Sequence, residues 1–172
     1  GSRGLGDVYK RQDSGRGYRK IVCSPEPVGI VESSFIKGLT SLGLSIIAGG
    51  GGGIPLVQND DGSLSGCEAV IDKDLTSALL AKEIGASTLV ILTGVERVAI
   101  NYNRPEQQWL DTVSLAQMKQ YYQEGHFAEG SMGPKVLAAM RFVENSGSRA
   151  IITCLEKVVE ALRGQTGTII VA

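Results

Sequence analysis

A run of five glycines is the first feature of this sequence that could do chemistry. The glycines at 49–53, Gly50, Gly51 and Gly52 among them, follow the apolar run at 44–48, which is typical of a buried strand. Successive glycine N–H groups can form a nest for an anion, and the missing Cβ atoms let a phosphate approach the backbone. The Ile-Pro that follows fits neither a P-loop nor a dinucleotide fingerprint. We therefore expect an anion or close-ligand loop, with a flexible loop as the alternative.

A second candidate, Asp72-Lys73-Asp74, lies at the start of a predicted helix. An aspartate there is ordinary N-capping chemistry, and this is the alternative explanation for the motif. Capping needs only one aspartate, however, and Lys73 is unfavourable at the positive end of a helix. The cluster makes sense if Lys73 contacts a phosphate and the aspartates hold the lysine charged and oriented.

The third candidate is Gly-Ser-Met-Gly-Pro-Lys at 130–135, where a glycine-bearing loop again meets a predicted helix start. Helix N-termini bind anions, and Lys135 in the first turn is electrostatically misplaced unless an anion is present. A solvated surface lysine is the alternative for this motif taken alone. Together, the glycine nest and the two lysines are typical of phosphoryl transfer, which depends on positioning and charge neutralisation.

Other kinds of site find less support in the sequence. The one histidine, His126, lies in a predicted loop, and we interpret it as structural or solvent-exposed rather than catalytic. The three cysteines, at 23, 67 and 154, are far apart and have no zinc-like spacing, so we expect no metal site built from them. Because the sequence has one histidine and we do not interpret it as catalytic, we expect no Ser-His-Asp chemistry.

The elements that must position these motifs alternate between helix and strand. Hydrophobic periodicity and end signals predict helices over 32–42, 74–84, 114–122 and 156–162, and a further one that begins at Gly133-Pro134 and ends at 145–147. Apolar runs predict strands at 44–48, 88–92, 150–154 and 168–171, and a turn signal at 59–62 predicts a hairpin. This order indicates a mostly parallel sheet with helices on both faces.

Composition is consistent with one such domain. The chain has 172 residues, 42% hydrophobic and 20% charged, and its one outlier is 23 glycines. The net charge of −1 argues against nucleic-acid binding, and no apolar run has the ~18 residues of a membrane span. No signal peptide is recognisable, so we expect a cytoplasmic protein. We expect residues 1–17, which are polar, basic and aperiodic, to be a disordered or non-native tail.

The motifs, in this order and spacing, resemble those of the carbamate kinases, a branch of the amino-acid kinase superfamily. The segments that match are AGGGGGIP (48–55), EAVIDKD (68–74), LTGV (92–95), NY (101–102), GHF (125–127) and GSMGPK (130–135). The similarity runs from about residue 17 to the last residue. It implies a three-layer α/β/α sandwich around a mainly parallel sheet. It also implies an enzyme that interconverts ATP plus carbamate with ADP plus carbamoyl phosphate, uses Mg²⁺, and serves arginine breakdown as a cytoplasmic homodimer.

The resemblance also implies roles for individual residues. Lys73 matches the lysine that contacts the transferred phosphoryl group, and Lys135 the one that reaches the nucleotide phosphates. Asp74 matches the aspartate that organises the lysines, and Asp72 lies beside it. Gly50, Gly51 and Gly52 match the loop that faces carbamoyl phosphate. The matches to the stretches that line the nucleotide pocket are Thr93, Gly94, Val95, Tyr102 and Met132.

The sequence departs from the family in length, because the family is about twice as long. The resemblance therefore implies that residues 18–172 are the nucleotide-binding carboxyl-terminal portion of the fold and that the amino-terminal half, with its own phosphate loop and carbamate-covering subdomain, is missing. We expect the 172-residue chain alone to be inactive, and its sheet to have an exposed apolar edge. The alternative function is a non-catalytic nucleotide-binding or regulatory paralogue. A weaker alternative is another amino-acid kinase, one that acts on glutamate or acetylglutamate.

Overall fold

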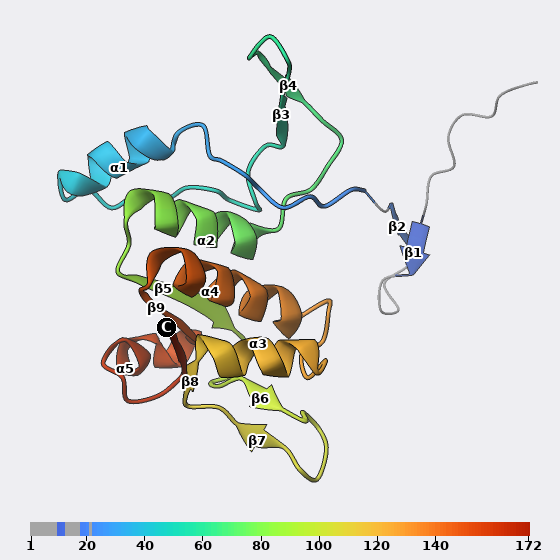
Figure 1. The fold of residues 1–172 in the computed structure, drawn as a ribbon, viewed down its shortest axis with the longest axis vertical. Helices are drawn as coiled ribbons and strands as arrows, with labels where there is room; N and C mark the ends of the chain where they lie inside the picture. The colour runs from blue at the N-terminus through green and yellow to red at the C-terminus, as the bar shows by residue number, and fades with distance from the viewer. Residues whose placement is uncertain (1–9, 13–17, 21) are drawn as a thin grey trace, which may run out of the picture.

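The computed structural model describes residues 10–12, 18–20 and 22–172 (Figure 1). Its helices are α1 (Ser33–Ser41), α2 (Lys73–Ile84), α3 (Leu115–Gln123), α4 (Met132–Ser146) and α5 (Val158–Leu162), with a 3₁₀ turn at Leu155–Lys157 before α5. Its strands are β1 (Lys10–Gln12), β2 (Tyr18–Lys20), β3 (Leu56–Gln58), β4 (Leu64–Gly66), β5 (Thr88–Thr93), β6 (Ala99–Ile100), β7 (Gln108–Trp109), β8 (Thr112–Ser114), β9 (Arg149–Cys154) and β10 (Thr168–Val171).

The main sheet has the strand order β5-β9-β10-β8, with β5 at one edge. β5 pairs with β9 in parallel, and so does β10 with β8, whereas β9 and β10 are antiparallel. The α/β class is confirmed, but the sheet is mixed rather than mostly parallel, because β10 and β8 both run opposite to β5 and β9. The reason is the short connection, because a five-residue α5 spans only about 7.5 Å. It cannot return the chain along the whole of β9, which is roughly 20 Å long.

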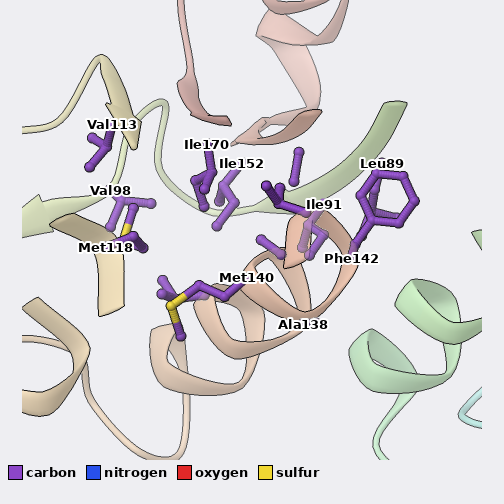
Figure 2. Close-up of a cluster of buried hydrophobic side chains, with 14 of the residues drawn as sticks. Leu89, Ile91, Val98, Val113, Met118, Ala138, Met140, Phe142, Ile152 and Ile170 are labelled. Carbon is purple, nitrogen blue, oxygen red and sulfur yellow. The ribbon is translucent and has the colours of Figure 1, made fainter. Parts of the chain in front are cut away.

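The hydrophobic core lies between this sheet and α4. Figure 2 shows Met140 and Phe142 of α4 meeting Leu89, Ile91 and Ile152 of the strands. Because side chains alternate along a strand, Ile151 points to the other face, where it packs near Ala161 of α5 around Gly167. The sheet therefore has α4 on one face and α5 on the other, so the chain forms three α/β/α layers.

Most of the predicted elements from α2 onward are confirmed with small changes at their ends. α2 ends at the left-handed Gly85, and α3 begins with the predicted Ser114–Gln117 capping box. The sequence predicts that Pro134 opens α4, but the helix begins at Met132, so Pro134 is its third residue. The short strands β6, β7 and β8 lacked a recognisable sequence pattern and were not predicted.

The segment 44–48 is not a strand, which corrects the sequence-based prediction. Leu44 is 52% exposed and Ile47 is fully exposed. A strand exists only through hydrogen bonds to a neighbour, and within the described residues this segment has none to another strand. The predicted apolar face of α1 is similarly open, because Ile36 alone of its residues is buried while Phe35 is 67% exposed.

The amino-terminal segment is only partly described. β1 pairs antiparallel with β2, so a strand lies inside the segment 1–17 that we expect to be a tail. The remaining positions of that segment, 1–9 and 13–17, lie outside the described residues, and the domain boundary at 17 stays a prediction. No helix in the described part of the chain is long and apolar enough to cross a membrane.

Candidate functional site

The N-terminus of α2 is held by a side-chain cap and presents a lysine. Asp72 adopts an extended backbone conformation, and its carboxylate accepts hydrogen bonds from the N–H groups of Asp74 at 2.8 Å and Leu75 at 3.1 Å. The capping explanation is therefore confirmed for Asp72. It does not account for Lys73, which is exposed and makes no ion pair within the described part of the chain, although it lies at the positive end of the helix dipole.

Asp74 joins the second motif to the third. Its carboxylate accepts a hydrogen bond from the Lys135 ammonium at 2.8 Å, and the two side chains are only 12% and 15% exposed. α2 and α4 pack against each other, so this ion pair links their N-terminal turns. A nearly buried carboxylate therefore fixes the position of the Lys135 side chain. The role of Asp74 in organising the lysines stays a prediction.

The glycine loop contacts the same end of α2. Gly52 has φ +134°, and a Cβ atom there would lie 2.0 Å from the Ile71 carbonyl oxygen, so only glycine fits. The buried Thr76 hydroxyl donates to the Gly52 carbonyl at 2.8 Å and ties the loop to the first turn of α2. Sequence reasoning missed Thr76 because its hydrogen-bond partner is 24 positions away.

The start of α4 also depends on a close backbone approach. The N–H of Gly133 donates to the Ala128 carbonyl at 2.9 Å, and a Cβ atom at Gly133 would lie 3.0 Å from that oxygen. Ser131 precedes the helix without capping it through its side chain, unlike Asp72 in α2. The first turn of α4 therefore presents Lys135 from a tightly folded glycine-bearing loop, as the third motif predicts.

A cavity of about 590 Å³ lies between the carboxyl end of β5, the β6–β7 hairpin and the start of α4. All five residues that we expected around a nucleotide line it, namely Thr93, Gly94, Val95, Tyr102 and Met132. Lys73, Lys135 and the glycine loop do not line it, but Ser131 and Met132 of the third motif do, and Met132 is one turn before Lys135 in α4. The cavity therefore lies against the same helix turn that carries Lys135.

Further residues of the cavity wall escaped sequence reasoning. Trp109 meets Tyr102 edge to face, with ring centroids 6.4 Å apart, and both side chains are about half exposed. His126, which we interpreted as structural or exposed, also lines the cavity, and its Nε2 lies 3.1 Å from the Glu124 carboxylate. The lining thus combines aromatic faces with cationic groups, including Arg97 and Arg104.

This fold and this site define a member of a known class. The model of the amino acid kinase family matches residues 8–154, so the chain belongs to that family. The match begins inside the segment 1–17.

The relatives that the chain matches include carbamate kinases. The chain is 52% identical over 160 residues to the carbamate kinase of Thermococcus kodakarensis, and this alignment covers 93% of this chain and 50% of the relative. It is 54% identical over 160 residues to the carbamate kinase-like protein YahI of Escherichia coli, covering 93% and 51%. A carbamate kinase from Giardia lamblia bound to AMP-PNP superimposes with a TM-score of 0.89 at 44% identity, covering 95% and 51%. The chain thus spans about half the length of the relatives it matches.

Proposed function

We propose that this chain is the nucleotide-binding half of a carbamate kinase, which transfers a phosphoryl group between ATP and carbamate to give ADP and carbamoyl phosphate. The observation that carries the proposal is the Asp74–Lys135 ion pair, which brings together the two lysine-bearing helix starts. The similarity to carbamate kinases and the match of one of them bound to an ATP analogue support the same activity.

Each residue then has a chemical task. The base and ribose occupy the cavity against Tyr102 and Met132, and Thr93, Gly94 and Val95 contribute backbone and small side chains at the end of β5. Lys135 meets the nucleotide phosphates, and Lys73 neutralises the phosphoryl group as it is transferred. The glycine loop, with Gly50, Gly51 and Gly52, faces the carbamoyl phosphate side. Phosphoryl transfer needs such charge neutralisation more than a covalent nucleophile.

Mg²⁺ enters this proposal together with the nucleotide. The described residues contain no group of three or more His, Cys, Asp or Glu side chains that could hold a metal ion. Mg²⁺ usually keeps several waters and binds through substrate phosphates and one or two carboxylates. Asp72 and Asp74 lie at the start of α2, where we propose that the phosphates bind, and two carboxylates of this kind suit an ion that arrives with the nucleotide.

The activity is tested in a chimera that joins residues 18–172 to the remaining half of the Thermococcus kodakarensis relative. We expect it to form ATP from ADP and carbamoyl phosphate. Lys73→Gln and Lys135→Met should each lower kcat/KM by about 10²–10³, the usual cost of losing one charge-stabilising contact. Lys157→Met, which removes an exposed lysine near α5, should leave kcat/KM unchanged.

The 172-residue chain itself is tested by calorimetric titration with Mg-ATP. We expect binding that weakens in Lys135→Met and no turnover without the other half. If the chimera bound ATP but formed none from ADP and carbamoyl phosphate, the kinase assignment would be wrong and the chain would be a nucleotide-binding paralogue. If the chimera turned over but both lysines proved dispensable, the roles assigned to Lys73 and Lys135 would be wrong. The physiological setting that we propose with the activity, cytoplasmic arginine breakdown by a homodimer, is supported by the family resemblance.

A further inference from the structure

The β6–β7 hairpin forms one wall of the cavity and is held together by its own hydrogen bonds. Within the described chain its strands pair only with each other, with Ala99 opposite Trp109, and they form a sheet separate from the main one. In the connecting loop, the N–H of Arg104 donates to the Asn101 carbonyl at 3.0 Å. In Figure 1 the hairpin projects from the body of the molecule. Its position therefore depends on how its base is attached to the main sheet.

A buried threonine of the main sheet makes this attachment. The hydroxyl of Thr168, the first residue of β10, accepts a hydrogen bond from the Val98 N–H at 2.8 Å and donates one to the Leu110 carbonyl at 2.5 Å. Val98 and Leu110 lie opposite each other at the hairpin base, where the Leu110 N–H donates to the Val98 carbonyl at 2.8 Å. In an antiparallel pair, the return bond would join the Val98 N–H to the Leu110 carbonyl. The Thr168 hydroxyl replaces that bond by bridging the two groups.

The burial of this junction makes the hydroxyl difficult to replace. Thr168 and Val98 are 0% exposed and Leu110 is 5% exposed, and Val98 belongs to the hydrophobic cluster shown in Figure 2. A buried N–H or carbonyl group that loses its partner keeps its desolvation cost, because water does not reach it. An aliphatic side chain at position 168 would therefore make the hairpin base shift until both groups find other partners.

A second contact joins the two ends of the hairpin, one residue further from the tip. Arg97 forms an ion pair with Asp111 at 2.7 Å, but the side chains are 33% and 71% exposed. Ion pairs that water reaches contribute little to stability. The buried bridge through Thr168 is therefore the stronger of the two attachments.

The hairpin carries two aromatic side chains of the cavity wall. Trp109 directly precedes Leu110, and Tyr102 in the connecting loop meets it edge to face. Both line the cavity, whereas Thr168 does not. A change at Thr168 can therefore alter the cavity only through the position of the hairpin.

We propose that Thr168 is a positioning residue for the nucleotide, because its hydroxyl holds the β6–β7 hairpin where Tyr102 and Trp109 close the cavity around the base and ribose. This inference rests on the proposed function, since it takes the cavity as the nucleotide site. It assigns Thr168 to nucleotide affinity and not to phosphoryl transfer, which depends on Lys73 and Lys135.

The first test is calorimetric titration of the 172-residue chain with Mg-ATP. Thr168→Val removes the hydroxyl and keeps the shape of the side chain, and we expect it to raise Kd by about tenfold. Thr168→Ser keeps the hydroxyl and should recover most of the affinity. Thr153→Val is the matched control and should bind like the parent, because Thr153 is also 0% exposed in a strand but its hydroxyl has no hydrogen-bond partner within the described residues.

The kinetic test uses the chimera of residues 18–172 with the other half of the Thermococcus kodakarensis relative. Thr168→Val should raise KM for ADP by about the factor found for Kd, and it should change kcat by less than about twofold, because the interaction it disturbs is made equally in the ground and transition states. A loss of kcat with KM unchanged would place Thr168 in phosphoryl transfer and overturn the proposal.

Trp109 is the one tryptophan of the chain, so its fluorescence reports the hairpin in the absence of nucleotide. Acrylamide should quench Trp109 more strongly in Thr168→Val than in the parent or in Thr153→Val, with the far-UV circular dichroism unchanged. If Thr168→Val does not fold, Thr168→Cys gives the same comparison, because a thiol is a weaker donor and acceptor than a hydroxyl.

The proposal is overturned if Thr168→Val keeps the quenching and the Kd of the parent, or if Thr153→Val weakens binding equally. If the parent chain does not bind Mg-ATP, the nucleotide site and this proposal both fail. A parent that binds Mg-ATP but shows no turnover in the chimera overturns only the kinase activity, and the effect of Thr168→Val on Kd then still supports the positioning role.

Discussion

Lys73 shows how a residue can be placed against the preference of its own helix. It follows the cap of α2, where a positive charge opposes the helix dipole, and it has no ion-pair partner within the described residues. A cation near a helix N-terminus costs about 0.3–1 kcal/mol. We propose from this placement that the lysine serves a bound anion rather than the fold.

The first prediction separates these two roles of Lys73. Lys73→Gln should leave the free energy of unfolding unchanged or raise it by a few tenths of a kcal/mol, because an unfavourable charge is removed. The same variant should lose affinity for Mg-ATP or carbamoyl phosphate in the chimera. Lys82→Gln is the matched control in the last turn of α2, where the charge is favourable, so it should destabilise slightly and leave affinity intact. Urea unfolding and calorimetry measure both, and a large loss of stability in Lys73→Gln would contradict the assignment.

The second prediction concerns the glycine loop. Gly52→Ala forces a Cβ atom against the Ile71 carbonyl at a φ that L-residues rarely adopt, so it should destabilise by about 1–3 kcal/mol. Gly51→Ala has open space around it and no positive φ, so it should be neutral or slightly stabilising. Thermal unfolding of the two variants checks this, and equal effects would show that the loop does not need glycine at position 52.

At the scale of elements, one ion pair joins the starts of α2 and α4. Because Asp74 and Lys135 are both nearly buried, either single variant, Asp74→Asn or Lys135→Met, leaves a charge without its partner and should destabilise by about 1–3 kcal/mol. The double variant should recover part of the loss, with a coupling energy above about 0.5 kcal/mol. The exposed pair Lys157–Glu160 provides the control cycle and should couple by no more than about 0.5 kcal/mol. Similar coupling in the two cycles would contradict a special role for Asp74.

A second pair of elements gives a pH dependence. The Lys119 ammonium of α3 donates to Glu144 of α4, and this hydrogen bond and the opposite charge lower the pKa of Glu144 from its usual 4.5. A lowered folded-state pKa contributes stability above pH 4.5 that is lost as pH falls below that value. Glu144→Gln should therefore show a shallower loss of stability than the parent between about pH 4.5 and pH 3. Urea unfolding across this range measures the difference, and parallel curves would contradict it.

At the scale of the whole molecule, the described chain divides into a core formed by residues from Leu75 onward and the segment 22–72, which we call the open layer because only Ile36 and Gly52 in it are buried. Opening free energies within a protein range from near zero up to the global value, and regions with few buried apolar contacts lie at the low end. Backbone amides in α4, β5 and β9 should therefore exchange at least about tenfold more slowly than those in the open layer, residues 22–72. Hydrogen exchange with mass spectrometry measures this for the chain alone, and uniform protection along the chain would contradict the division.

How far the sequence predicts this fold depends on whether the signals are local. α3 could be predicted from its Ser114–Gln117 capping box and α2 from Asp72 and Gly85, because caps involve neighbouring residues. β6 and β7 could not, because two-residue strands exist only through the hydrogen bonds between them. At 44–48 the sequence predicts a strand that the structure does not have, because the pattern of a strand is present but the neighbouring strand that would pair with it is not.

The residues of the candidate site could be predicted, but their contacts could not. Residue types and spacing by themselves determined the glycine loop, Lys73, Lys135 and the family resemblance, because each motif is a few consecutive residues. Only the tertiary structure decided that Asp74 meets Lys135, 61 positions away, and that Thr76 holds Gly52. Those contacts arise from the packing of α2 against α4 and against the loop, and a local pattern does not specify which distant polar group a buried side chain will find.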